Sequence, residues 1–507
     1  MTGGGPTSPV GTEPGADGLR GRMVSAVAWT AVEKWSGRLL SFAVFALLTR
    51  LLDHTNFGLF SLASAVVAVL SVFVDSGFSK AIVQRPALSR VDTSTTFWSS
   101  VVLSTAIYLL LVATAVPLAA LLGDPALAPV LRVAGLVVPL SALSRTTAAL
   151  LERDLRFRPL AVRQLTGNVA GAAVAVPLAL HGAGVWTLVA QVLVAALVST
   201  VLLWALTDWR PSLEFSRDSL RSMLSFGVHT LGIDLLAALQ TNLDKIVVGA
   251  LFDARTLGYY FVAQRATGVV LELATSVLGR VSLSVLSRVQ SDRQRLNRAL
   301  RQLTLASSVV ALPAFAMLAI FADVLLPLLV GDGWSASVPL FQVLTLSSAL
   351  AAVMFFDVNV LTAVGRPAVA LRLSILQNLV GVGLILLAAP FGTVAVAWSR
   401  SLRLLVLWPA RLWAMRRHAG IEIAAYVGLV GRTVVGLVPA SALAVGLAAT
   451  PWVHHQGAVR ALAVAAVSTL LYLACTWFVL GTENRTALRR FVLSLRSRPA
   501  PVTPSAR

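Results

Sequence analysis

Residues 241–270 read TNLDKIVVGALFDARTLGYYFVAQRATGVV, an apolar stretch that carries Asp244, Lys245 and Arg265. Part of it, FDARTLGYYFVA, echoes LDHTNFGLFSLA, which lies much earlier at residues 52–63. Long apolar runs around a short turn predict two membrane-spanning helices. The echo predicts that the chain contains an internal repeat.

The composition of the whole chain is that of an integral membrane protein. Of its 507 residues, 57% are hydrophobic and only 12% are charged, about half the charged share of a soluble domain. Only helices and closed barrels satisfy their backbone groups in lipid, and the apolar runs here are continuous rather than alternating. The sequence therefore predicts an all-α membrane protein. Its single cysteine, Cys475, excludes an internal disulfide and a cysteine-based metal cluster, and we expect no metal site.

Fourteen candidate transmembrane spans can be placed along the chain. They lie near 23–51, 57–83, 96–122, 127–150, 159–180, 184–206, 222–251, 256–284, 303–330, 337–364, 368–390, 392–414, 424–449 and 457–480.

Basic residues gather in every second loop, for example Arg288 to Arg301 and the group Arg411, Arg416 and Arg417. Because cytoplasmic loops carry the Lys/Arg excess, we expect both termini to be cytoplasmic in a bacterial plasma membrane. The net charge of +19 then follows from topology, and a nucleic-acid partner is not expected. Loops on the other side are short, such as FDART at 252–256, and no P-loop pattern appears. The chain is therefore not expected to be an enzyme, and no catalytic residue is assigned.

Four landmarks recur in order in the two halves. They are Leu52-Asp53 with Phe252-Asp253, Leu122-Gly123-Asp124 with Val330-Gly331-Asp332, Arg158-Pro159 with Arg366-Pro367, and Gly184 with Gly392. Six spans separate the copies, so both copies have the same orientation and form a parallel repeat, which is a transporter architecture. The predicted domains are a cytoplasmic tail 1–22, an N-lobe 23–206, a C-lobe 222–415, two extra spans within 424–480 and a basic cytoplasmic tail 481–507.

Cationic side chains inside predicted spans are candidate substrate ligands, since charge in a membrane is costly. Lys34 and Arg38 share one helical face, and Lys245 and Arg265 each lie ten residues from Arg255. In a helical hairpin Lys245 and Arg265 therefore lie at the same depth, about 12–15 Å from the outer end. With Arg38 facing them, these cations suit a diphosphate. The alternatives are that Lys34 snorkels to the headgroups, and that Asp244 pairs with Lys245 or Glu272 with Arg265.

Four acidic residues inside predicted spans are candidates for coupling to an ion. They are Asp75, Asp244, Glu272 and Asp357. A proton or a sodium ion is the expected coupling ion, and no other cofactor is expected. The alternative for each residue is a hydrogen bond between helices.

Two segments carry a family resemblance. GRLLSFAVFALLTRLLDHTNFGLFSLASAVVAVLSVFVDSGFSKAIVQR at 37–85 and TNLDKIVVGALFDARTLGYYFVAQR at 241–265 resemble bacterial polysaccharide and oligosaccharide flippases of the Wzx/WzxC type. These belong to the multidrug/oligosaccharidyl-lipid/polysaccharide exporter superfamily, and the resemblance covers about residues 25–415. It implies a V-shaped, two-lobe flippase with a cationic cavity. Such a protein moves an undecaprenyl-diphosphate-linked glycan from the inner to the outer leaflet by alternating access. Membrane lipids and polysaccharide polymerase or assembly proteins are the implied partners.

Three other functions compete with this one. A multidrug or cation exporter of the same superfamily would favour an acidic, aromatic cavity, whereas the deep charges here are mostly cationic. A lipid II flippase shares the fold and the chemistry and is separated poorly by sequence. A membrane glycan polymerase or ligase is disfavoured because the outer loops are short.

Overall fold

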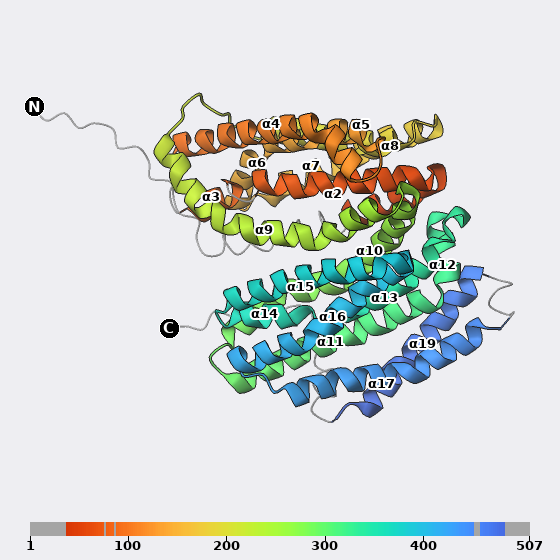
Figure 1. Ribbon diagram of the computed structural model, residues 1–507. Coiled ribbons are helices and arrows are strands. Elements are labelled where there is room, and N and C mark those ends of the chain that lie inside the picture. The colour runs from red at the N-terminus through yellow and green to blue at the C-terminus, as the bar shows by residue number, and fades with distance from the viewer. Residues whose placement is uncertain (1–36, 76–77, 86–87, 451–456, 482–507) are drawn as a thin grey trace, which may run out of the picture. The chain divides into compact units, whose positions relative to one another are not determined.

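The computed structural model describes residues 37–75, 78–85, 88–450 and 457–481. Across these residues the regular structure is helical and includes no strand (Figure 1). The prediction of an all-α membrane protein is confirmed. The predicted tail 1–22 lies outside the described residues, and so does the predicted tail 481–507 apart from Gly481.

Most described helices overlap the predicted spans, but the predicted spans 57–83, 127–150 and 337–364 each cover two helices. After a helical segment at 37–51, the first half contains α2 (His54–Asp75), α3 (Phe78–Gln84), α4 (Arg90–Leu121), α5 (Leu127–Ala134), α6 (Val137–Arg153), α7 (Phe157–Leu180) and α8 (Val185–Ala205). The second half contains α9 (Arg217–Leu251), α10 (Ala254–Arg288), α11 (Arg293–Ile320), α12 (Ala322–Val330), η1 (Asp332–Trp334), α13 (Ser337–Val353), α14 (Phe355–Ala363), α15 (Pro367–Ala388), η2 (Ala389–Phe391) and α16 (Thr393–Ala419). Two further helices follow, α17 (Ile423–Ala448) and α19 (Gly457–Val479).

Among the described residues, nine helical stretches are long and apolar enough to cross a membrane. The chain is therefore a multi-pass membrane protein, while the count of fourteen spans stays a prediction. The ninth predicted span, 303–330, differs from the structure because the helix ends at Ile320 and α12 begins after Phe321. Helix α11 begins at Arg293, ten residues before the predicted span, because the basic segment before the apolar run is also helical.

The described chain forms two compact units. Unit 1 falls within Met1–Phe45, Leu70–Thr114 and Leu131–Gly232, and unit 2 within Ala46–Val69, Ala115–Val130 and Ile233–Arg507. Unit 2 thus contains most of α2 together with the second half of the chain. The lobe boundaries expected from sequence stay a prediction.

Unit 1 contains a tightly packed hairpin of α7 and α8. A Cβ atom at Gly167 would lie 2.7 Å from the carbonyl oxygen of Ala195, and one at Gly171 would lie 2.6 Å from that of Gln191. Such distances are too short for a side chain. The two glycines therefore allow the backbones of the two helices to meet, as small residues do between membrane helices.

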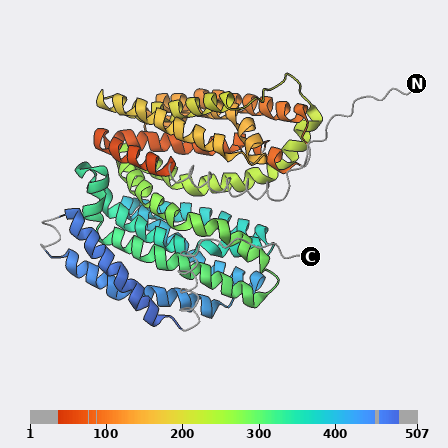
Figure 2. The ribbon, with the colours of Figure 1, turned by 180° about the vertical axis from the view of Figure 1, so that it is seen from behind.

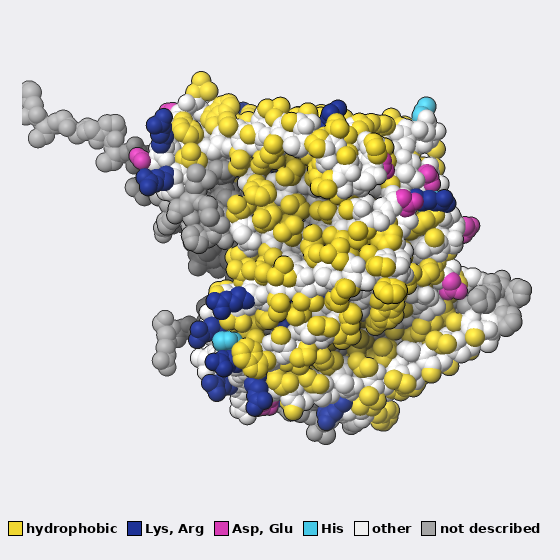
Figure 3. Space-filling model, in the orientation of Figure 1, with side chains coloured by type: hydrophobic (Ala, Val, Ile, Leu, Met, Phe, Trp, Pro, Cys, Tyr) yellow, Lys and Arg dark blue, Asp and Glu magenta, His cyan; other side chains and the backbone are white. Residues whose placement is uncertain are grey.

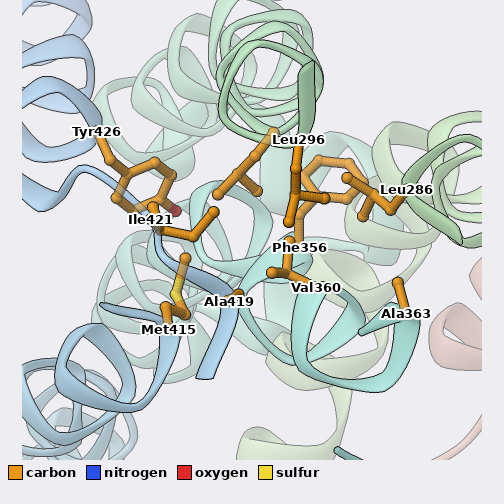
Figure 4. Close-up of a cluster of buried hydrophobic side chains, with 10 residues drawn as sticks. Leu286, Leu296, Phe356, Val360, Ala363, Met415, Ala419, Ile421 and Tyr426 are labelled. Carbon is orange, nitrogen blue, oxygen red and sulfur yellow. The ribbon is translucent and has the colours of Figure 1, made fainter. Parts of the chain in front are cut away.

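Unit 2 has a buried apolar core at the end where α11 begins and α16 ends. Leu296 on α11, Phe356 on α14, Met415 on α16 and Tyr426 on α17 meet there (Figure 4). The same end carries exposed arginines, which Figure 3 shows gathered beside a flank of apolar side chains. They are Arg293, Arg295, Arg298, Arg416 and Arg417. Helices α17 and α19 pack side by side (Figures 1 and 2).

Equivalent landmarks of the repeat have the same local structure. Gly184 and Gly392 both cap the N-terminus of a helix, with φ of 58° and 89°. Only glycine adopts such angles readily, so the shared glycine marks a shared chain reversal.

Two other equivalent glycines, Gly58 and Gly258, each pack against the backbone of the other repeat inside unit 2. A Cβ at Gly58 would overlap the carbonyl oxygen of Ala254, and a Cβ at Gly258 would overlap that of His54. Helices α2 and α10 therefore cross symmetrically at their first turns. Beside the crossing, the indole Nε1–H of Trp334 donates to the carbonyl oxygen of Thr49 over 2.8 Å.

Candidate functional site

Charged side chains of unit 2 gather where α9 meets α16. Asp244 on α9 has 1% of its surface exposed. Its Oδ2 lies 3.3 Å from Nη1 of Arg400, and its Oδ1 lies 3.7 Å from Nη1 of Arg403. We call these three residues the α9–α16 charge cluster. It places two guanidinium groups beside one carboxylate in the interior of a membrane protein.

The helix geometry explains how α16 contributes both arginines. Arg400 and Arg403 are three residues apart, so their side chains leave the same face of the helix. Helix α15 leaves space for them, because a Cβ at Gly381 would lie only 2.8 Å from Nη1 of Arg403. One turn away on α15, Gln377 accepts a hydrogen bond from the buried Arg411. The face of α15 toward α16 is therefore adapted to arginine side chains.

The cluster is incompletely hydrogen-bonded. Within the described chain, Oδ2 of Asp244, Nη1 of Arg400 and Nε of Arg403 are buried and make no hydrogen bond. Strong guanidinium–carboxylate pairs have N···O distances of about 2.7–2.9 Å, shorter than those found here. The ion pairs therefore hold the arginines in place and leave hydrogen-bonding capacity unused.

Lys245 extends the positive charge of the cluster. Its Nζ lies 3.3 Å from Oδ1 of Asn242 and 5.8 Å from the centre of the Phe261 ring. It also interacts electrostatically with Arg400, Arg265 and Asp244. The structure therefore brings Lys245 and Arg265, both predicted from sequence, into one charged region with Arg400.

The other predicted cations lie elsewhere or outside the described residues. Arg38 belongs to unit 1 and is half-buried. Lys34 lies outside the described residues. The predicted substrate role of Lys34, Arg38, Lys245 and Arg265 stays a prediction.

The predicted acidic residues occupy three different environments. Asp244 takes part in the charge cluster, whereas Glu272 is exposed and interacts with Arg265. Asp357 on α14 is fully buried and accepts a hydrogen bond of 2.6 Å from the hydroxyl of Tyr426. The side chain of Asp75 lies outside the described part of the molecule. Ion coupling through any of the four stays a prediction.

Three arginines of α16 are absent from the site candidates derived from sequence; Arg403 and Arg411 are buried, and Arg400 is partly exposed. Arg400 and Arg403 lie inside the predicted span 392–414, so their position in an apolar run was the available signal. The charge pattern of the sequence assigns Arg411 to a cytoplasmic loop, but the residue is buried within α16. A topology argument assigns arginines near span ends to loops, because sequence does not show which ones a neighbouring helix receives.

The sequence matches a family model described as polysaccharide biosynthesis protein over residues 47–339. The succinoglycan biosynthesis transport protein ExoT of Rhizobium meliloti (strain 1021) is 26% identical, covering 94% of this chain and 97% of that protein. The lipopolysaccharide biosynthesis protein WzxC of Escherichia coli (strain K12) is 24% identical, covering 66% of this chain and 68% of that protein.

Two solved structures are similar in fold. The lipid II flippase MurJ in an inward closed conformation has a TM-score of 0.69 at 12% identity, covering 89% of this chain and 99% of that one. An inward-facing multidrug resistance MATE transporter of the MOP superfamily has a TM-score of 0.55 at 17% identity, covering 79% and 98%. The fold is thus of the flippase and exporter type, and, by the match over more than half of its length, the chain belongs to the polysaccharide biosynthesis protein family.

Proposed function

We propose that this protein is a flippase that moves a lipid-linked oligosaccharide from the inner to the outer leaflet of the plasma membrane during polysaccharide biosynthesis. The observation that carries the proposal is the excess of positive charge in unit 2. Asp244 balances only one of the charges of Arg400, Arg403 and Lys245. A buried excess of cations is costly unless an anion joins it, so the site suits an anionic substrate.

The substrate proposed here is a glycan joined to undecaprenyl diphosphate. Its diphosphate provides the anionic group, and its prenyl chain remains in lipid while the glycan crosses through water. Relatives named for succinoglycan transport and lipopolysaccharide biosynthesis support a polysaccharide precursor as cargo. Membrane lipids and polysaccharide polymerase or assembly proteins are the partners that this role requires.

Transport by alternating access requires an energy source, and we propose a proton or sodium gradient. The buried Asp357, held by Tyr426, is one carboxylate that can take up a proton. Both termini are proposed to be cytoplasmic, in keeping with the arginines exposed where α11 begins and α16 ends.

The test uses the full-length protein purified into proteoliposomes that contain fluorescent undecaprenyl-diphosphate-linked oligosaccharide. Accessibility of the glycan to a membrane-impermeant glycosidase reports movement between leaflets. We expect protein-dependent movement that accelerates when a proton or sodium gradient is imposed. Export of a cationic dye without movement of the lipid would instead assign the protein to the drug exporters.

A further inference from the structure

We propose that Arg400 and Arg403, positioned by Asp244 and joined by Lys245, form the site that binds the diphosphate group of the substrate. This inference rests on the proposed function and names the residues of its substrate site. It differs from the sequence-based assignment, in which α16 contributed nothing.

The first argument is charge. The region holds four cations and two carboxylates, which leaves an excess of two positive charges. The cations are Arg400, Arg403, Lys245 and Arg265, and the carboxylates are Asp244 and Glu272. A diphosphate that links a lipid to a sugar carries two negative charges, one on each phosphate. A carboxylate or a phosphate monoanion would balance only half of the excess. The charge of the region therefore favours a diphosphate over a singly charged ligand.

The second argument is unused hydrogen-bonding capacity. Nη1 of Arg400 and Nε of Arg403 are buried without a hydrogen bond in the described chain. Guanidinium groups bind phosphate oxygens through paired N–H donors with fixed geometry. Two such groups on one helix face match two adjacent phosphates, and Lys245 adds a compact point charge.

The third argument is access. The side chain of Arg400 is 27% exposed, whereas that of Arg403 is 7% exposed. A ligand can therefore approach along Arg400 and reach Arg403 behind it. Gly381 makes room for the guanidinium of Arg403, because any side chain at that position would meet it.

Asp244 is a positioning residue in this proposal. It contacts both arginines at distances of 3.3 and 3.7 Å, and so holds two like charges side by side before the ligand arrives. Without it, the two guanidiniums would repel each other and separate.

The experiment measures binding to the full-length protein in detergent, so it does not depend on transport. The probes are geranylgeranyl diphosphate, geranylgeranyl monophosphate and inorganic pyrophosphate, and thermophoresis gives each Kd. We expect R400Q and R403Q each to raise the Kd for geranylgeranyl diphosphate at least about tenfold, as the loss of a charge-assisted hydrogen bond implies. R403K should retain part of the affinity, and R432Q, at an exposed position of α17, should leave the Kd unchanged.

The probes separate a lipid headgroup from free pyrophosphate. If R400Q and R403Q lose affinity for both geranylgeranyl diphosphate and inorganic pyrophosphate, the site binds the diphosphate group and does not require the lipid chain. Loss for geranylgeranyl diphosphate, with no binding of inorganic pyrophosphate to the wild type, supports a site for the lipid. A wild type that binds no diphosphate, or prefers the monophosphate, overturns the proposal, as do variants with unchanged Kd. If R403Q does not fold, the partly exposed R400Q and G381A, which crowds Arg403, provide the same test.

The binding result also separates this inference from the proposed function. A wild type that binds geranylgeranyl diphosphate through these arginines but moves no lipid-linked glycan contradicts the flippase role and leaves the site intact. A wild type that transports, with R400Q and R403Q that bind and transport normally, contradicts the site and leaves the flippase role intact.

Discussion

The hairpins α7–α8 and α15–α16 occupy equivalent places in the two repeats, yet their interiors differ. In α7–α8, Gly167 and Gly171 bring the two backbones into contact. In α15–α16, Gly381 instead makes room for the side chain of Arg403. The register given by Gly184 and Gly392 aligns the arginines of α16 with Val192 and Ala195 of α8.

This difference shows that the charges are not required by the fold. The same hairpin forms with valine and alanine in one repeat and with two arginines in the other. On α9, Asp244 and Lys245 likewise align with the apolar Val44 and Phe45. Buried charges cost free energy in a membrane, and one repeat folds without them. This contrast supports the proposal that they bind a ligand.

The largest effect is expected from Asp244→Ala, which removes the only carboxylate of the α9–α16 charge cluster. Breaking a buried ion pair on one side costs about 3–5 kcal/mol, because the remaining charges are left uncompensated. The detergent-solubilised variant should unfold at a clearly lower temperature than the wild type. Val44→Ala at the equivalent position is the control and should cost less. An unchanged Tm for Asp244→Ala would show that the arginines do not depend on this residue.

The second-largest effect is expected at the crossing of α2 and α10, where the two repeats have the same structure. Gly58→Ala and Gly258→Ala should both destabilise the protein, by about 1–3 kcal/mol each, because each new methyl group overlaps a backbone carbonyl of the other repeat. Thermal unfolding of the two variants measures this. Gly428→Ala on α17, whose Cβ would meet nothing within 4 Å, is the matched control. A large effect at only one of the two glycines would contradict the symmetric crossing.

A third pair of variants, one in each hairpin, compares the roles of Gly171 and Gly381. Gly171→Ala meets the backbone of α8 and should lower stability by about 1 kcal/mol or more. Gly381→Ala meets a flexible side chain, so it should change stability less and impair glycan movement more. Unfolding curves and the glycosidase-accessibility assay, run on both variants, give the comparison. Equal effects in both assays would mean that the two glycines have the same packing role.

The smallest effect concerns two equivalent aspartates at helix starts, Asp53 and Asp253. Burial acts to raise the pKa of Asp53, but hydrogen bonds from the backbone and ring of His54 outweigh it and lower that pKa. Hydrogen bonds from Thr256 lower the pKa of Asp253. Each carboxylate therefore adds stability above its unfolded pKa of about 3.9, and this stability is lost as pH falls through the lower folded pKa.

The Tm of the wild type should accordingly fall below about pH 4, and Asp53→Asn and Asp253→Asn should each flatten that fall slightly. The effect is small because both residues are largely exposed, with 63% of the Asp53 side chain accessible. Tm measured from pH 6 to pH 3 provides the test. A pH profile identical in wild type and double variant would contradict it.

Much of the fold could be predicted from sequence because membrane insertion depends on local composition. The apolar runs predicted the helices. The similarity of residues 52–63 to 252–263 predicted equivalent positions, and the matching contacts of Gly58 and Gly258 agree with that equivalence. The site was only partly predictable. Lys245, Arg265 and Asp244 stood out as charges in an apolar run, but the partners of Asp244 lie more than 150 residues later on α16.

Sequence by itself determined that this protein is a helical, multi-pass membrane protein with a repeat, since these properties follow from composition and periodicity along the chain. Only the tertiary structure decided that Asp244 pairs with Arg400 and Arg403 rather than with its neighbour Lys245. Adjacent residues of a helix point about 100° apart, so Asp244 does not face Lys245 and pairs instead with arginines of another helix. Which helix that is depends on packing, and packing joins residues that the sequence keeps far apart.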